Sequence, residues 1–164
     1  MNKICTLVAI AALAVVAAGG VHAQQPPPPA ANTAAAPYVL TMGDLMNTLV
    51  QPRHAKLGLA GRAGNWPLAA YALVELRQVF AGIKKAQPKF GGLPVPELID
   101  AAVGPPLDAV EAAIKQQDAN KFAAAYDRLT QGCNGCHQSV DHPFVVIKPP
   151  EASAFPDQDF SPGR

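Results

Sequence analysis

Apolar residues in the middle of the chain recur every three or four positions, which is the spacing of an amphipathic helix. No strand-like alternation of useful length interrupts this pattern. The pattern therefore predicts an all-α domain over residues 38–147. Four amphipathic helices with short connections pack naturally as an antiparallel four-helix bundle, and this is the expected fold.

The first two predicted helices are separated by a short turn. The first begins near Thr41, a good N-cap, and runs to about Ala60. Pro52 lies inside it and predicts a kink or a break, because proline has no N–H to donate within a helix. The second runs from its cap, Asn65, to about Lys85.

The second half of the domain begins with a turn-rich crossing at Gly91–Pro96. A short helical piece is expected over Glu97–Val103, and the Pro-Pro pair at 105–106 predicts the start of a separate third helix. Asp118 caps the fourth helix, which runs to about Val140. Four aromatic residues are expected in the core: Tyr71, Phe80, Phe122 and Tyr126.

The two ends of the chain have different compositions from the domain. Residues 1–23 have a basic start, an apolar run of 15 residues and small residues before Ala23, which predicts a secretory signal peptide cleaved after Ala23. The run is shorter than the ~20 residues that span a bilayer, so no integral membrane span is expected after cleavage. The alternative is an uncleaved anchor. Residues 24–37 form a Pro-rich linker and 148–164 a Pro-rich irregular tail, which Phe155 and Phe160 can pin to the domain.

The charge of the chain is balanced, with 13 basic and 12 acidic residues, so a nucleic-acid partner is not expected. The balance hides an asymmetry. Residues 38–90 hold seven basic and two acidic residues, whereas the chain from Gly91 onward holds five basic and ten acidic residues. Two solvated faces of opposite sign explain this pattern, and so does a docking surface for a charged partner.

The candidate chemistry is the run Cys133-Asn134-Gly135-Cys136-His137 in the last predicted helix. Two thiols one helical turn apart can add to the two vinyl groups of a haem, and His137, on the same face, can bind its iron. This spacing is the signature of covalent haem c attachment. Alternatives are a thioredoxin-like pair, which needs a βαβ setting, a zinc site that includes His142, and a strained disulfide.

The motif lies late in the chain, because only 27 residues follow His137 and none is methionine. The methionines of the mature chain, Met42 and Met46, are both in the first helix. The opposite face of the haem must therefore be closed by that helix. Met46 is the candidate distal ligand, with Met42 in reserve and ordinary core packing as the alternative role.

With Met46 early in the first helix and the motif at Cys133–His137 in the last, the chain resembles the cytochrome c-prime family, the class II c-type cytochromes, over residues 38–140. The resemblance implies a periplasmic four-helix protein that is frequently dimeric. It implies Cys133 and Cys136 as the haem thioethers and His137 as the proximal ligand. Met46 falls where the family places its distal residue, which ligates the iron in low-spin members. The Pro-rich ends and Pro52 depart from the family pattern.

The predicted function is single-electron transfer in the periplasm, and the expected partners are a redox partner protein and a second copy of the chain in a homodimer. The alternative is a five-coordinate haem that binds a small gas such as nitric oxide. An enzymatic role is not expected, since no acid–base pair converges on the distal position. Four further side chains are assigned smaller roles: His54 as a partly exposed helix-end residue, His142 as a surface residue, and Arg53 or Arg62 as a partner for a haem propionate.

Overall fold

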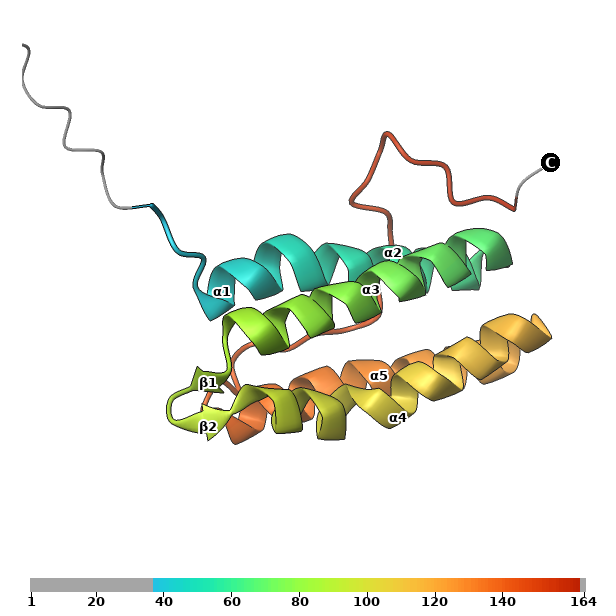
Figure 1. The fold of residues 1–164 in the computed structure, drawn as a ribbon. Coiled ribbons are helices and arrows are strands. Elements are labelled where there is room, and N and C mark those ends of the chain that lie inside the picture. Colours follow the sequence, from blue (N-terminus) through green and yellow to red (C-terminus); the bar gives the residue numbers. More distant parts are fainter. Residues whose placement is uncertain (1–36, 163–164) are drawn as a thin grey trace, which may run out of the picture. The chain divides into compact units, whose positions relative to one another are not determined.

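The computed structural model describes residues 37–162. The predicted signal peptide, its cleavage after Ala23 and residues 24–36 of the predicted linker lie outside the described residues. The described chain is predominantly helical, as the sequence predicts, and its helices lie alongside one another (Figure 1). The elements in chain order are α1 (Met42–Leu45), the π-helix η1 (Met46–Val50), α2 (Gln51–Arg62), α3 (Trp66–Ala86), β1 (Lys89–Phe90), β2 (Leu93–Pro94), α4 (Val95–Gln116) and α5 (Ala119–Ser139).

Three of the predicted N-caps are confirmed. Thr41 and Asp44 form a capping box at α1, in which each side chain bonds the backbone N–H of the other. The side chain of Asn65 accepts from Leu68 N at the start of α3, and that of Asp118 accepts from Lys121 N at the start of α5. These bonds satisfy backbone donors that have no partner inside the helix.

The prolines act differently from the expectation. Pro52 does not end the first helix, because the chain takes in the π-turn η1 just before it, where Gln51 N donates to Met46 O. The separation expected at the 105–106 pair is wrong: α4 is one helix that contains both prolines. Pro106 has no N–H for the carbonyl of Ala102, and Gly132 of α5 lies so close to this oxygen that a Cβ at Gly132 would overlap it.

A two-residue hairpin, β1–β2, was not expected from the sequence. Phe90 pairs with Leu93, and both turn residues, Gly91 and Gly92, have positive φ angles that glycine adopts readily. The hairpin joins α3 to α4 and places Phe90 near the end of α5, where it packs against His142 with ring centroids 5.6 Å apart.

The core lies between two pairs of helices, α2 with α3 and α4 with α5, which also meet along α3–α4 and α2–α5 (Figure 1). Phe80, Phe122 and Tyr126 are buried as expected. The expectation for Tyr71 is wrong, because its side chain is 61% exposed and bonds Glu75 at the surface. The inward positions of α3 are instead one helical face that includes Ala69, Ala72, Leu73 and Leu76.

The C-terminal tail is irregular, as expected, and it packs onto the helices. Phe160 contacts the core cluster, and Phe155 lies under the ammonium of Lys56. Arg62 donates to Pro150 O, and Asn65 Nδ2 donates to Ser161 O at 2.6 Å. Within residues 37–162, no helix is both long and apolar enough to cross a membrane.

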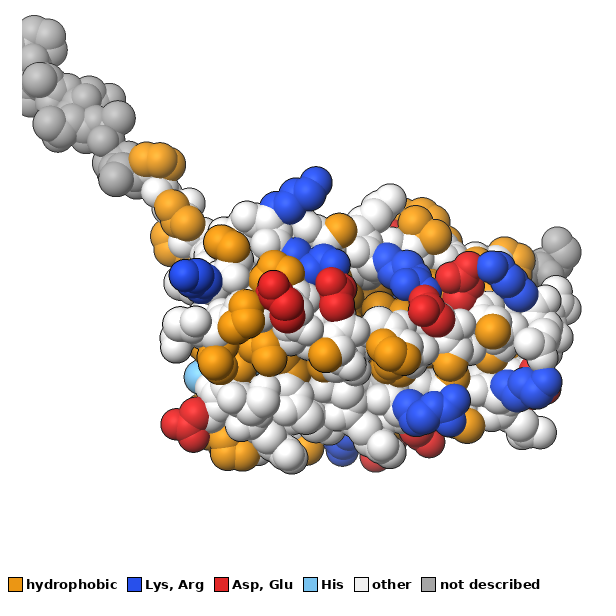
Figure 2. Space-filling view, turned by 60° about the horizontal axis from the view of Figure 1, so that its bottom comes forward, with side chains coloured by type: hydrophobic (Ala, Val, Ile, Leu, Met, Phe, Trp, Pro, Cys, Tyr) orange, Lys and Arg blue, Asp and Glu red, His pale blue; other side chains and the backbone are white. Residues whose placement is uncertain are grey.

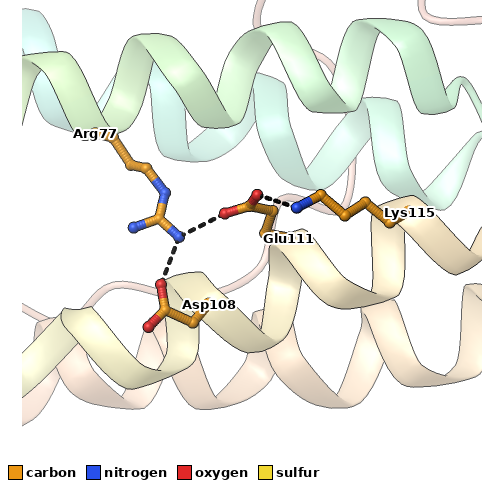
Figure 3. A network of polar contacts seen from close by, with 4 residues as sticks. All are labelled: Arg77, Asp108, Glu111 and Lys115. Atoms are coloured by element: carbon orange, nitrogen blue, oxygen red, sulfur yellow. Dashed lines mark hydrogen bonds and ion pairs between the residues drawn. The ribbon is translucent and has the colours of Figure 1, made fainter.

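Ion pairs between α3 and α4 account for part of the charge asymmetry. Arg77 of α3 pairs with Asp108 at 2.7 Å and Glu111 at 3.1 Å, and Glu111 also pairs with Lys115 (Figure 3). A second pair between the same helices joins Lys84 to Asp100 at 2.7 Å. On the face shown in Figure 2, acidic and basic side chains are interspersed. The basic α3 and the acidic α4 are therefore neighbours that neutralise each other at their contact.

Candidate functional site

The site lies along the contact between the first helical line, α1–η1–α2, and α5, which runs antiparallel to it. Near one end, Gly58 lies against the ring of Tyr126 and Gly61 against the ring of Phe122. Further along, His54 meets Thr130. Beyond that point the side chains no longer fill the space, and the contact opens into a cleft.

Two adjoining pockets make up this cleft. Both pockets are open to solvent, and they share part of their lining. The side chains of Met46, Cys136 and His137 line both pockets, while His54 and Cys133 line the first. The structure thus brings together all four residues that the sequence singles out, Met46 from η1 and Cys133, Cys136 and His137 from α5.

The π-turn explains why Met46 and His54 reach the same cleft. Eight positions separate them, which in a plain α-helix is about 2.2 turns and puts them about 80° apart around the axis. A π-turn takes in about one residue more than an α-turn, so the eight positions complete about two turns. Both side chains therefore lie on the face toward α5. The absence of an N–H at Pro52 makes this loosened turn less costly.

The two cysteines are free thiols in a mostly apolar environment. Burial raises the pKa of Cys133 to about 12, and it also raises the pKa of Cys136. Such thiols are poor thiolate nucleophiles at neutral pH, which disfavours a thioredoxin-like pair. Within residues 37–162, no three His, Cys, Asp or Glu side chains come together as a metal ion would require.

His137 is partly buried in the last turn of α5, and one of its ring nitrogens is engaged. Its Nδ1 lies 2.8 Å from the carbonyl oxygen of Val145. A carbonyl oxygen only accepts, so Nδ1 carries the proton and the free lone pair of the neutral ring is on Nε2. An imidazole that binds a metal almost always has this arrangement, with the second N–H donated to a carbonyl or carboxylate.

His54 is the main correction to the expected site. His54 is expected from the sequence to be a partly exposed helix-end residue, but it is only 4% exposed. Its Nε2 lies 3.0 Å from Thr130 Oγ1 and its Nδ1 lies 3.0 Å from Tyr126 Oη, and its ring stacks on that of Tyr126. Burial lowers the pKa of His54 to about 4, so the ring is neutral at pH 7.

The other expected side chains lie at the edge of the cleft or away from it. His142, expected at the surface, is half-buried, lines the second pocket and donates from Nδ1 to Val140 O at 2.7 Å. Arg53 and Arg62, the expected propionate partners, line neither pocket. Arg53 bonds Leu49 O, and Arg62 is at the far end of α2 beside the tail.

Sequence reasoning missed a segment that follows α5 and closes one side of the cleft. Val145 and Ile147 both line the first pocket, and Ile147 is bonded at its N–H and its C=O to the side chain of Asn134. No signal in the sequence indicates this return, since Asn134 occupies one of the two variable positions of the motif. Comparison with protein-family models, with curated proteins and with solved structures finds no match for this chain.

Proposed function

We propose that the protein is a periplasmic c-type cytochrome that carries one haem, attached through thioether bonds to Cys133 and Cys136, and transfers single electrons. The observation that carries this proposal is the cleft itself. It brings Met46 together with a motif that lies 87 positions later, and it leaves the Nε2 lone pair of His137 available.

The lining of the cleft fits a haem. It includes the groups that hold a haem c, namely the thiols of Cys133 and Cys136, the imidazole of His137 and the thioether of Met46. Among the residues that line the two pockets, none is Asp, Glu, Lys or Arg, and most are apolar. An apolar macrocycle can therefore be desolvated there without burying an unpaired charge.

The fold proposed for this function is the antiparallel four-helix bundle of the class II c-type cytochromes, which the chain resembles. Secretion to the periplasm, a homodimer and a periplasmic redox partner belong to the same proposal. The four long helices and their contacts support the bundle, and the run of apolar residues before Ala23 supports export.

Within this proposal, the haem iron supplies the one-electron chemistry and the chain holds it in place. Cys133 and Cys136 would fix the macrocycle along α5, and His137 would ligate the iron from that side. Met46 would ligate it from η1, and thioether ligation favours a high reduction potential. Apolar side chains such as Val50 and Ile99 would exclude water from the haem. The reorganisation energy would therefore stay small when the charge of the iron changes.

The alternative is a gas-binding haem in which Met46 only packs over the iron. A polar group in the distal pocket can favour a bound gas, and His54 lines the cleft. Both of its ring nitrogens already have partners on α5, however, so the ring has no free donor to offer. This arrangement favours electron transfer.

Absorption spectra of the purified protein in both oxidation states test the proposal. We expect a haem that stays with the polypeptide after denaturation, a low-spin spectrum, and little carbon monoxide binding. The Cys133→Ala/Cys136→Ala double variant should lose the covalent haem. A high-spin ferric spectrum with ready carbon monoxide binding would support the gas-binding alternative instead.

Met46→Ala identifies the distal ligand. We expect this variant to keep its haem, become high-spin and bind carbon monoxide, because the sixth position is then open. Met42→Ala is the matched control, since Met42 lines only the second pocket, and the spectrum of this variant should remain that of the wild type. An unchanged spectrum in Met46→Ala contradicts His137/Met46 ligation.

A further inference from the structure

The chain reverses its direction directly after α5. Val140 is the C-cap, and Asp141 has a left-handed conformation with φ of 62°. Asp141 N donates to Gln138 O and His142 N donates to His137 O at 2.7 Å, which is the bonding pattern of a Schellman motif. Pro143 follows and prevents the helix from resuming. Residues 140–147, called the return segment below, therefore run back along the cleft.

Asn134 anchors the far end of the return segment with two hydrogen bonds. Its Nδ2 donates to Ile147 O at 2.8 Å, and its Oδ1 accepts from Ile147 N at 2.7 Å. A side-chain amide that bonds the N–H and C=O of one residue imitates the pairing between two strands. The return segment has no regular secondary structure of its own, so it depends on such contacts to be held in place.

Between these two anchors, the segment presents one carbonyl to the motif histidine. Val145 O accepts from Nδ1 of His137 at 2.8 Å. The neighbours of Val145 point outward, with Phe144 77% and Val146 72% exposed, whereas Val145 and Ile147 line the cleft. The position of the Val145 carbonyl is therefore determined by the turn at Asp141 on one side and by Asn134 on the other.

We propose that Asn134 is a positioning residue: by locking the return segment, it holds the Val145 carbonyl against His137 and so sets the orientation and donor strength of the ligating imidazole. This rests on the proposed function, since the imidazole matters as a ligand only if a haem is bound. Covalent attachment places no demand on the residue between the cysteines. In this chain, that position couples the motif to the segment that follows it.

The physical consequence concerns the electron density of the ligand. An N–H donated to a carbonyl makes the other ring nitrogen a stronger donor, and a stronger donor stabilises the more positive oxidised iron. Release of the return segment should therefore raise the reduction potential. A residue with a purely structural role would change stability and leave the potential where it was.

The test compares Asn134→Ala with Asn120→Ala in the haem-loaded protein. Both substitutions replace an asparagine of α5 by a better helix former, and the side chain of Asn120 is exposed. Hydrogen exchange at the Ile147 amide and chymotrypsin cleavage after Phe144 report release of the segment. Loss of the two hydrogen bonds to Ile147 predicts an increase of about tenfold or more in both rates for Asn134→Ala.

The potential and the spectrum report the effect on the ligand. We expect a higher potential and an altered Nδ1–H proton signal of His137 in Asn134→Ala, and neither change in Asn120→Ala. Asn134→Asp keeps the acceptor to Ile147 N but loses the donor, so its cleavage rate should lie between those of the wild type and Asn134→Ala.

A released segment with an unchanged potential would overturn the proposal while the haem function stands, and so would a shifted potential without release. Unchanged values in both measurements would overturn it too. A wild-type protein without covalent haem contradicts the proposed function itself, and the first spectrum reveals this before any variant is compared.

Discussion

The contact between the helical line α1–η1–α2 and α5 is closed in one half and open in the other. In the closed half, the small residues Gly58 and Gly61 receive the rings of Tyr126 and Phe122, and the helices meet without a gap. In the open half, the side chain of Met46 on η1 and those of the motif on α5 do not fill the space between them, and a cleft remains. The two halves differ as the proposed function requires: the open half has space for a haem, and the closed half is tightly packed.

The boundary between the halves is the polar cluster of His54, Tyr126 and Thr130. Tyr126 Oη donates to His54 O at 2.7 Å, and Thr130 Oγ1 lies 3.0 Å from both Tyr126 O and Nε2 of His54. These bonds tie α2 to α5 at the place where glycine packing stops. Because the cluster faces the cleft on one side and the rings on the other, its stability should depend on both halves.

The largest predicted effect on stability comes from protonation of His54 in this cluster. The pKa of His54 falls from about 6.5 when unfolded to about 4 when folded, so between these values the unfolded chain binds more protons and the stability rises with pH. As the pH falls from 6.5 to 4, we expect the wild type to lose about 3 kcal/mol of unfolding free energy through His54 alone.

His54→Gln provides the reference, because carboxylates titrate in both proteins and only the histidine differs. Denaturant unfolding of the two proteins at several pH values should show a stability difference that changes with pH below 6.5 and is constant above it. A constant difference across the whole range would mean that the boundary is not closed to protons.

Filling the closed half should cost less, about 2 kcal/mol. A methyl group at Gly61 overlaps the ring of Phe122, which is buried and has little room to move. Gly82→Ala is the matched control, since a Cβ there meets open space and should stabilise α3 by about 1 kcal/mol. Unfolding curves of the two variants should therefore shift in opposite directions. If Gly61→Ala is as stable as Gly82→Ala, the closed half is not tightly packed.

Tyr126→Phe removes the hydroxyl of Tyr126 from the cluster and keeps its ring. The ring still covers Gly58, but Nδ1 of His54 loses its partner, so we expect a loss of about 1 kcal/mol. The haem spectrum should change little, because the hydroxyl does not line the cleft. Thr130→Val tests the second hydrogen bond of the same cluster, which joins Thr130 to His54. Leu129→Phe is not a suitable control, because it adds volume. A variant with unaltered stability would show that solvent already reaches His54.

The smallest effect is expected away from both halves, in the ion pairs between α3 and α4. Asp108 is largely exposed, so Asp108→Ala should lower the melting temperature only slightly. The difference from the wild type should disappear in about 1 M salt, where charges are screened within ~3 Å. A large shift that persists in salt would place part of the stability outside the α2–α5 contact.

The sequence predicts well what depends on neighbouring residues. The caps at Thr41, Asn65 and Asp118 are read correctly because each bond joins residues three positions apart. The approach of Met46 to the motif is predicted because no methionine follows the motif, and the two methionines of the predicted mature chain both lie in the first helix. Continuation of α4 through its prolines could not be predicted, since contacts with α5 offset the lost bonds.

Errors arise where the helical period changes or where a distant segment returns. His54 is assigned to a partly exposed helix end beside Pro52, but the π-turn before this proline brings it onto the face that carries Met46. Tyr71 is taken for a core residue because apolar positions surround α3 on more than one face. The position of the return segment could not be predicted, because the hydrogen bonds of Asn134 join it to a residue thirteen positions later in the chain.

The π-turn makes the identity of the side chain facing the cleft a matter of chain length as well as of chemistry. Removal of one residue from η1 would restore a plain α-helix, in which the seven positions between Met46 and His54 make about 1.9 turns and leave both side chains on nearly the same face. One extra residue in η1 would instead turn Met46 by about 100° away from the cleft, although Met46 itself would not be mutated. If the proposed haem is bound, the absorption spectrum of a Thr48 deletion should resemble that of the wild type, and that of a one-residue insertion after Thr48 should resemble that of Met46→Ala.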